Sequence, residues 1–247
     1  MRYFLILSYQ GTAYKGWQIQ RNAPSVQATI ENGLSAILRS EIHITGAGRT
    51  DTGVHASYYV AHFDSDSIAD EADFIYHLNS ILPKDIAATE IKKVRDDAHA
   101  RFDAIEREYT YRIVNRKDPF LREFSWQYYA MLDMQAMNEA AAHLLAFDDF
   151  TTFAKLNSAN KTNICHVTHA QWERTDNGMT FVIRADRFLR NMVRAITGTL
   201  VEVGRGKMTP NEFRNIIAAK DLSLSGSSAP AQGLFLSNVE YPEEIFL

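Results

Sequence analysis

One carboxylate, Asp51, lies where the chain concentrates residue types that can do chemistry. An arginine (Arg49), two threonines and several glycines surround it in segment 46–53, directly after the apolar segment 42–45. Glycine relaxes the steric limits on φ, so this composition favours a tight turn. A strand that ends in such a turn presents polar residues at the rim of a sheet, where loops carry functional groups. Asp51 is therefore the first candidate for a catalytic residue.

Three chemical roles and one structural role are compatible with Asp51. Asp51-Thr52-Gly53 is the aspartic-protease tripeptide, but that mechanism needs a second such aspartate, and the chain has no other Asp-Thr-Gly or Asp-Ser-Gly. Gly46-Ala47-Gly48 could open a dinucleotide fingerprint, but Asp51 would then replace its third glycine and repel a pyrophosphate. An ionised Asp51 could be a nucleophile or base, with Arg49 engaging an anionic substrate. A turn aspartate that caps its own backbone is the structural alternative.

The nonapeptide Gly48–Ala56, Gly-Arg-Thr-Asp-Thr-Gly-Val-His-Ala, closely resembles the active-site motif of the TruA family of tRNA pseudouridine synthases. That motif usually reads Gly-Arg-Thr-Asp-Ala-Gly-Val-His-Ala. The resemblance continues in order along nearly the whole chain, in segments 14–18, 25–27, 99–102, 108–111, 188–194 and 233–236. Two departures are mild: Thr52 replaces the usual alanine, and Ala195 stands where the family often has asparagine.

The resemblance implies an enzyme that isomerises uridine to pseudouridine at positions 38, 39 and 40 of the tRNA anticodon arm. It also implies a homodimer, with tRNA spanning both subunits, and a reaction that needs no cofactor and no metal. Asp51 would be the catalytic carboxylate. Attack on the sugar C1′ and another route, such as deprotonation at C2′, both stay open. A catalytically inactive RNA-binding protein of the same fold is the alternative, although a binder has no need of a buried nucleophile.

Four further residues are considered for the site. Arg194 lies on a mostly apolar helix, and a buried charge without a partner costs about 3–5 kcal/mol. Asp51 is its natural partner, and the pair would keep Asp51 ionised. The resemblance implies the same pair and places Tyr109 against the target base. Arg49 is expected to hold the flipped nucleotide or fill the space it leaves. His55 is expected either to brace the turn or to take part in chemistry.

Charge is unevenly distributed along the chain. The formal net charge is −4, which is unexpected for a protein that binds phosphates. Segment 64–73 holds five acids and no base, whereas segment 184–207 holds six bases against two acids. The bases are Arg184, Arg187, Arg190, Arg194, Arg205 and Lys207. This segregation predicts a basic cleft on an acidic protein, with Arg190 facing phosphate. The alternative is that both segments are solvated faces.

Composition narrows the class of protein. With 46% apolar and 11% aromatic residues among 247, the chain can bury a substantial core. Cys165 is the lone cysteine, which fits a reducing cytoplasm, and no apolar run approaches the roughly 20 residues of a membrane span. We therefore expect a cytoplasmic protein outside the membrane. Cys165, His166 and His169 look like metal ligands, but positions 166 and 169 would point to opposite faces of a predicted strand. No phosphate-binding glycine loop is present.

Periodicity and turn signals predict an α+β fold with a largely antiparallel sheet. The resemblance implies a pseudouridine synthase fold, in which two related α/β halves surround a central RNA-binding cleft. Residues 1–105 would form the half with the Gly-Arg-Thr-Asp loop, and residues 106–247 the half with Tyr109 and the basic helix. Strands are predicted near 3–9, 42–47, 57–63, 86–95, 107–115, 125–130, 164–174, 179–187 and 234–240. Helices are predicted near 25–39, 71–81, from 133, near 189–203 and from 209.

Overall fold

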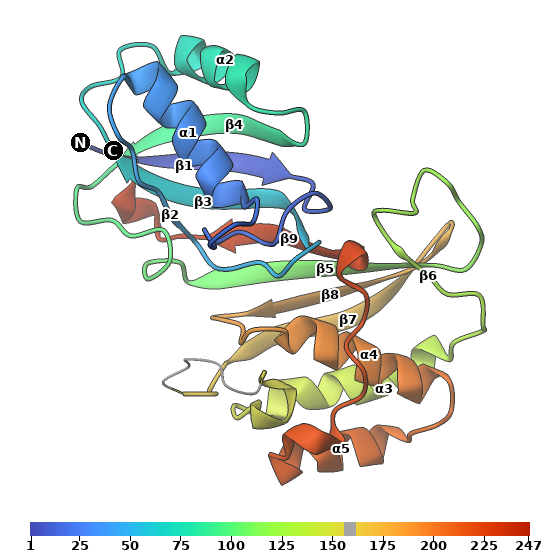
Figure 1. The fold of residues 1–247 in the computed structure, drawn as a ribbon. Coiled ribbons are helices and arrows are strands. Elements are labelled where there is room, and N and C mark those ends of the chain that lie inside the picture. The colour runs from blue at the N-terminus through green and yellow to red at the C-terminus, as the bar shows by residue number, and fades with distance from the viewer. Residues whose placement is uncertain (156–161) are drawn as a thin grey trace. The chain divides into compact units, whose positions relative to one another are not determined.

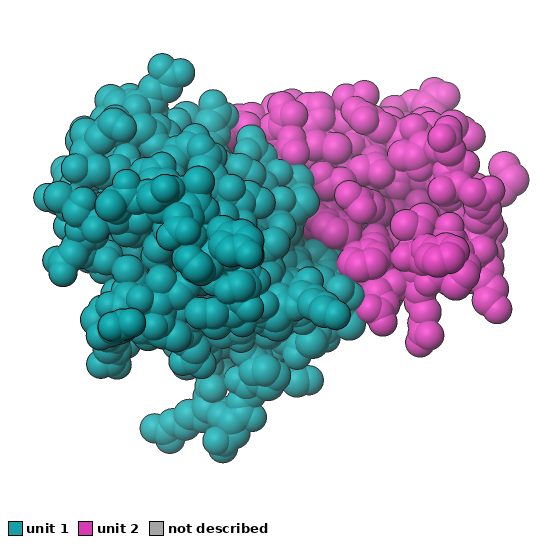
Figure 2. Space-filling model, turned by 90° about the horizontal axis from the view of Figure 1, so that it is seen from above, with its two compact units in different colours: residues 1–105, 236–247 teal, residues 106–235 magenta. Residues whose placement is uncertain are grey.

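The computed structural model describes residues 1–155 and 162–247, which form two compact units (Figure 2). Unit 1 comprises Met1–Ile105 and Leu236–Leu247, and unit 2 comprises Glu106–Phe235. Each combines antiparallel strands with helices (Figure 1), so the predicted α+β class is confirmed.

In unit 1 a long apolar strand lies at the centre of the sheet. Strand β1 (Arg2–Tyr9) pairs antiparallel with β3 (His55–Asp64) on one side and β4 (Ile86–Val94) on the other. The strand order is β4-β1-β3-β9, where β9 spans Leu234–Glu240, and the short β2 (Thr45–Gly46) also pairs with β3. Residues 3–7 of β1 are all at most 4% exposed, which makes this strand the core of the unit.

Two capped helices belong to unit 1, and α1 crosses in front of the strands in Figure 1. Helix α1 (Val26–Leu38) begins after Ser25, whose hydroxyl accepts from the Ala28 amide. Helix α2 (Glu71–Ile81) begins after Asp70, whose carboxylate accepts from the Asp73 amide. Both N-caps satisfy amides that the helix itself leaves without partners.

In unit 2, helices pack against an antiparallel sheet that consists of a hairpin and one further long strand. Strand β5 (Glu106–Val114) pairs with β8 (Gly178–Ala185), which forms a hairpin with β7 (Val167–Thr175) through Asp176-Asn177. Strand β6 (Trp126–Gln127) pairs with β5 in parallel. The helices are α3 (Met134–Ala142), α4 (Met192–Gly204) and α5 (Pro210–Ala219). Short 3-10 turns of this unit cover His143–Ala146, Thr151–Phe153, Leu222–Leu224 and Ala231–Gly233, and a further one, Glu243–Ile245, belongs to unit 1.

The structure shortens some predicted elements, because their amides bond elsewhere. The predicted strand 42–47 reduces to Thr45–Gly46, since the amides of Ile42 and Ile44 donate to Ser35 and Glu31 of α1. The predicted strand 125–130 reduces to β6. Strand β7 begins at Val167, because the amide of Cys165 donates to the Asp148 carbonyl. His166 therefore lies outside the strand, and the predicted alternation of positions 166 and 169 on one strand is wrong.

The basic helix also starts later than predicted. Helix α4 begins at Met192, after Asn191 adopts a left-handed conformation with φ of 66°, rather than at 189. Among the described residues, no helix is long and apolar enough to cross a membrane.

Candidate active site

In unit 1 the Gly48–Ala56 loop is anchored to the N-terminal segment through Thr50. The Thr50 hydroxyl lies 2.7 Å from the Tyr9 hydroxyl, and the Thr50 carbonyl accepts a hydrogen bond from the Trp17 amide at 3.2 Å. Thr50 is 7% exposed, so both bonds are shielded from water. These contacts fix the backbone immediately before Asp51.

A tight turn follows Asp51. The Val54 amide donates to the Asp51 carbonyl at 3.1 Å, and Gly53 adopts φ of 77°, a conformation that residues with a Cβ rarely take. Asp51 is half-buried and Arg49 is exposed. The turn chemistry expected from the sequence is therefore present, and it fixes the main chain on both sides of the carboxylate.

His55 secures the end of the turn. It is 1% exposed, and its Nδ1 accepts a hydrogen bond from the Gly11 amide at 3.0 Å. A Cβ on Gly11 would lie 1.9 Å from the Val54 carbonyl oxygen, so only glycine fits this approach. The bracing role, one of the two expected from the sequence, is confirmed.

Aromatic side chains support the start of the loop. The rings of Trp17 and Tyr59 stack with centroids 4.0 Å apart, and the Tyr59 hydroxyl donates to the Gly48 carbonyl. Gly46 lies against both rings, because an added Cβ would come within 2.1 Å of the Tyr59 hydroxyl and 2.7 Å of Trp17. No local pattern in the sequence indicates Tyr9 or Tyr59 as a support of this loop. Trp17 belongs to a segment that carries the family resemblance, but its contacts depend on residues far away in the sequence.

In unit 2 Arg194 is fixed near the start of α4. Its Nε donates to the Ala229 carbonyl at 2.7 Å, and the Ala229 amide donates to the Arg194 carbonyl at 2.9 Å. The segment before Ala229 packs closely on α4, because a Cβ on Gly198 would lie 1.9 Å from the Ser227 carbonyl oxygen. Arg194 is half-buried on a helix whose other residues are nearly all buried, as the sequence predicts.

Two tyrosines of β5 differ in exposure. Tyr111 is fully buried and donates to the Pro230 carbonyl at 2.8 Å. Burial raises the pKa of its phenol, and the Arg194 charge opposes this shift. Tyr109 is half-buried and meets the edge of Phe188 with centroids 5.1 Å apart. Tyr111 is thus a core residue, whereas Tyr109 retains exposed surface.

The predicted site residues divide between the units. Arg49 and Asp51 share one loop of unit 1, and Tyr109 and Arg194 belong to unit 2. The pairing of Asp51 with Arg194 and the role of Tyr109 stay predictions.

The basic segment 184–207 does not form one continuous patch. Arg205 and Lys207 follow the C-terminal end of α4 and pair with Glu202, whereas Arg190 precedes its N-terminal end. A helix of 13 residues separates these ends by about 20 Å. Arg184, on β8, pairs with Glu108 at 2.7 Å. The concentration of bases is therefore confined to Arg187, Arg190 and Arg194.

The acids of segment 64–73 have local structural roles. Asp64 pairs with Arg2 at 2.8 Å, and the Arg2 guanidinium lowers the pKa of that carboxyl. Asp70 caps α2, and acids in the first turn of a helix favour its dipole.

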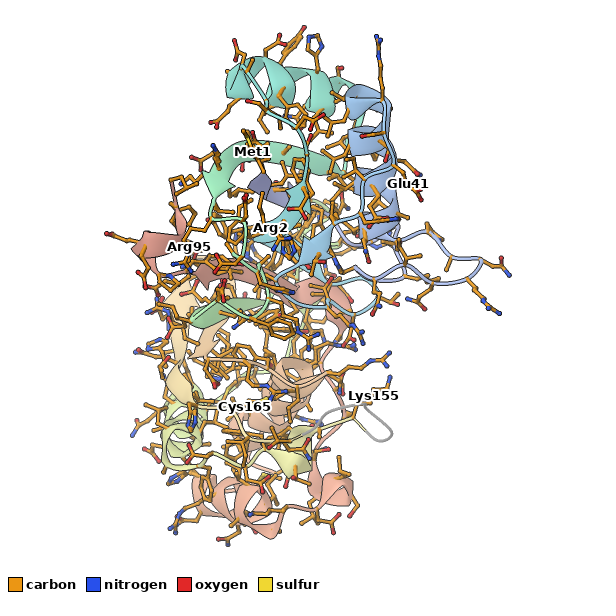
Figure 3. The ribbon with its side chains drawn as sticks, turned by 90° about the vertical axis from the view of Figure 1, so that its left-hand side faces the viewer. Met1, Arg2, Glu41, Arg95, Lys155 and Cys165 are labelled. Carbon is orange, nitrogen blue, oxygen red and sulfur yellow. The ribbon has the colours of Figure 1, made fainter. Side chains whose placement is uncertain are left out.

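The residues first considered as metal ligands have other contacts. The His166 Nδ1 lies 2.9 Å from an Asp148 carboxylate oxygen, and burial raises the pKa of the Cys165 thiol to about 12. Cys165 is labelled in Figure 3. In residues 1–155 and 162–247, no group of three or more His, Cys, Asp or Glu side chains is arranged to hold a metal ion.

Comparison with known proteins places this loop in a family. The sequence pattern of a family described as tRNA pseudouridine synthase matches residues 5–103 and 140–242, more than half of the chain. The chain belongs to this family. The matched segments contain Arg49, Asp51 and Arg194, whereas Tyr109 lies between them.

Relatives named tRNA pseudouridine synthase A align with nearly the whole chain. The protein from Bacteroides thetaiotaomicron is 52% identical, covering 99% of this chain and 92% of its own. The protein from Parabacteroides distasonis is 51% identical, covering 99% and 98%. A more distant relative from Aliivibrio salmonicida is 39% identical, covering 99% and 94%. The similarity therefore extends through both units of this synthase family member.

Proposed function

We propose that this protein isomerises uridine to pseudouridine in tRNA, at positions 38, 39 and 40 of the anticodon arm, and needs no cofactor. The observation that carries the proposal is the family's motif loop, fixed around Asp51, in a chain similar over its full length to proteins named tRNA pseudouridine synthase A. The reaction breaks the bond between N1 of uracil and C1′, and forms a bond between C5 and C1′. C5 loses a proton and N1 gains one, so no atom is added or removed.

Asp51 supplies the carboxylate that such an isomerisation needs. The bonds of Thr50 before it and of His55 after it hold its backbone in place, so the carboxylate is positioned before substrate arrives. Attack on C1′ and deprotonation at C2′ are both compatible with a half-buried carboxylate in a fixed turn. The target base must leave the helical stack, which costs a few kcal/mol. Arg49, exposed and two residues from Asp51, holds the flipped nucleotide or fills the space it leaves.

Arg194 and Tyr109 complete the proposed site. Nε of Arg194 is bonded to the Ala229 carbonyl, so its terminal N–H groups are the donors for a bidentate bond to the Asp51 carboxylate. Tyr109, which retains exposed surface beside Phe188, contacts the uracil ring. We further propose that the enzyme works as a homodimer in the cytoplasm, with tRNA contacting both copies; the mass of the enzyme in solution tests the dimer.

Asp51→Asn tests the central assignment. The substitution preserves size and removes the ionisable carboxylate, so tRNA binding through phosphates should survive while pseudouridine formation is lost. Thr52→Ala is the matched control, because alanine is the usual residue of the family motif and Thr52 is exposed. The control should convert uridine at a rate close to that of the wild type.

The assay is pseudouridine mapping on purified tRNA together with a binding measurement for each variant. Pseudouridine formed by the Asp51→Asn variant above the level of a mock preparation would exclude Asp51 as the essential carboxylate. Loss of activity without loss of binding would also separate the enzyme from the alternative, a catalytically inactive RNA-binding protein.

A further inference from the structure

A loop of unit 1, residues 95–105, joins β4 to β5 and is tied down at both ends. The Arg95 amide donates to the Ile245 carbonyl at 3.0 Å, and the Ile105 amide donates to the Glu240 carbonyl at 2.9 Å. Arg95 and Arg2 are labelled in Figure 3, and Arg2 pairs with Val94 in the sheet next to the start of the loop. The Arg2 guanidinium donates to the Ala98 carbonyl at 3.0 Å.

Two histidine rings fix the middle of the loop through its backbone. The Nδ1 of His62, on β3, accepts from the Ala100 amide at 3.0 Å. The Nδ1 of His99 accepts from the amides of Arg101 and Phe102 at 3.1 and 3.3 Å. All three amides are therefore bound by side chains within the unit, and the Ala100 amide, which is buried, is thereby satisfied away from water.

Further bonds close the loop into one turn. The His99 amide donates to the Asp103 carboxylate at 2.7 Å, while the Asp103 amide donates to the His99 carbonyl at 3.0 Å. The Tyr241 hydroxyl donates to the Ala100 carbonyl. Ala98 and Ala100 are fully buried. The loop is thus held as firmly as a regular element.

This rigid turn presents Phe102 to the outside. The Phe102 side chain is 73% exposed, its ring lies 4.3 Å from the His99 ring between centroids, and the Arg101 guanidinium carbon lies 5.5 Å from the Phe102 centroid. A single exposed phenylalanine is ordinary on a protein surface. An aromatic ring beside a guanidinium on a fixed backbone is, however, the arrangement on which unpaired bases stack.

The loop also lies within reach of the catalytic turn of the same unit. Ala100 bonds to His62, and His62 pairs with Thr45 across β2 and β3. Six residues lead from Thr45 to Asp51, and a chain of that length spans at most about 21 Å. His62 lies seven residues along β3 from His55, at the far side of the strand from the Asp51 turn, so an RNA whose target uridine reaches Asp51 can meet Phe102 through a nucleotide a few positions away on the same strand.

We propose that Phe102, with Arg101 beside it, is a stacking platform for an unpaired base of the substrate RNA near the target uridine. This inference rests on the proposed function, because it requires an RNA substrate. It adds a nucleotide-positioning contact outside the motif loop. The stacking contact itself neutralises no phosphate, so it strengthens binding without changing the dependence of binding on salt.

Phe102→Ala, Phe102→Leu and Phe102→Trp test the platform, with Phe120→Ala as the matched control. Phe120 is 85% exposed on unit 2, so it controls for the loss of any exposed phenylalanine. Loss of one base stack should weaken binding of an anticodon-arm RNA about 5- to 150-fold in the alanine variant. Tryptophan should restore binding to within about threefold, while leucine should not. The slope of binding against salt should match that of the wild type.

Several outcomes would overturn the platform. They are wild-type binding by Phe102→Ala, rescue of binding by leucine equal to rescue by tryptophan, and a loss of binding in Phe120→Ala equal to that in Phe102→Ala. A fourth is a mass in solution that differs between Phe102→Ala and the wild type, which would mean that a second copy of the chain covers Phe102. Conversion of uridine by the wild-type enzyme is measured in the same preparations. If the wild type converts uridine and the Phe102 variants behave as it does, only the platform fails. If the wild type forms no pseudouridine, the proposed function fails first.

Discussion

His62 should make unit 1 sensitive to acid. Its side chain is 7% exposed, and burial, followed by the charges of Arg2 and His99, lowers the pKa of His62 to about 4, while Asp64 and Asp103 oppose the shift. Protonation would also place a hydrogen on the Nδ1 that accepts from the Ala100 amide. The folded protein therefore favours neutral His62.

The sign and size of the effect follow from proton linkage. A histidine whose pKa is lower in the folded state contributes its full stability above pH 6.5, and that stability is lost as the pH falls from 6.5 toward 4. The shift from 6.5 to about 4 corresponds to about 3 kcal/mol between the two protonation states. Between pH 7 and pH 5, His62 alone should reduce the free energy of unfolding by about 2 kcal/mol.

His62→Asn isolates this contribution, because its side-chain oxygen can accept from Ala100 in place of Nδ1 and does not titrate. The loss of unfolding free energy between pH 7 and pH 5, measured by urea denaturation, should be about 2 kcal/mol smaller in the variant. His77→Asn, at an exposed position on α2, is the control and should behave as the wild type. An NMR titration of His62, assigned with the same variant, should have its midpoint near pH 4. A midpoint above pH 6, or equal losses in the wild type and His62→Asn, would show that burial of His62 does not destabilise unit 1 in acid.

Three further predictions concern the active site and the phosphate contact proposed for Arg190. Gly46→Ala should lower the free energy of unfolding by about 1–3 kcal/mol and slow catalysis, because its Cβ would strike Tyr59. Gly48→Ala, with nothing within 4 Å of the added Cβ, should change the free energy of unfolding by no more than about 0.5 kcal/mol. Similar denaturation midpoints for the Gly46→Ala and Gly48→Ala variants would contradict this expectation. Arg194→Ala should reduce the single-turnover rate far more than Arg190→Ala, and normal turnover by a folded Arg194 variant would exclude the pairing with Asp51. Arg190→Ala should instead weaken binding of all tRNAs and flatten the log–log salt slope by about one unit, whereas an unchanged slope would show that Arg190 contacts no phosphate.

Sequence patterns predict local structure well where all the interacting residues lie within one short stretch. The N-cap at Ser25, the capping box of Thr209 and Glu212, and the turn at Asp176-Asn177 each join residues only a few positions apart, and the elements that they begin or connect lie close to the predicted ranges. The motif around Asp51 is also a run of neighbouring residues, and it indicates both the family and the candidate catalytic carboxylate. The roles of Arg194 and Tyr109 came from resemblance and stay predictions.

The fold class, the family and the tight turn at Asp51 can be predicted from the sequence, because composition, periodicity and motif are properties of neighbouring residues. The contacts that hold this turn become visible only in the folded chain. Thr50 bonds to Tyr9 and His55 bonds to Gly11, over separations of about 40 residues that no local pattern encodes. The bases of segment 184–207 likewise lie toward both ends of α4, because a helix separates its residues along its axis by about 1.5 Å each.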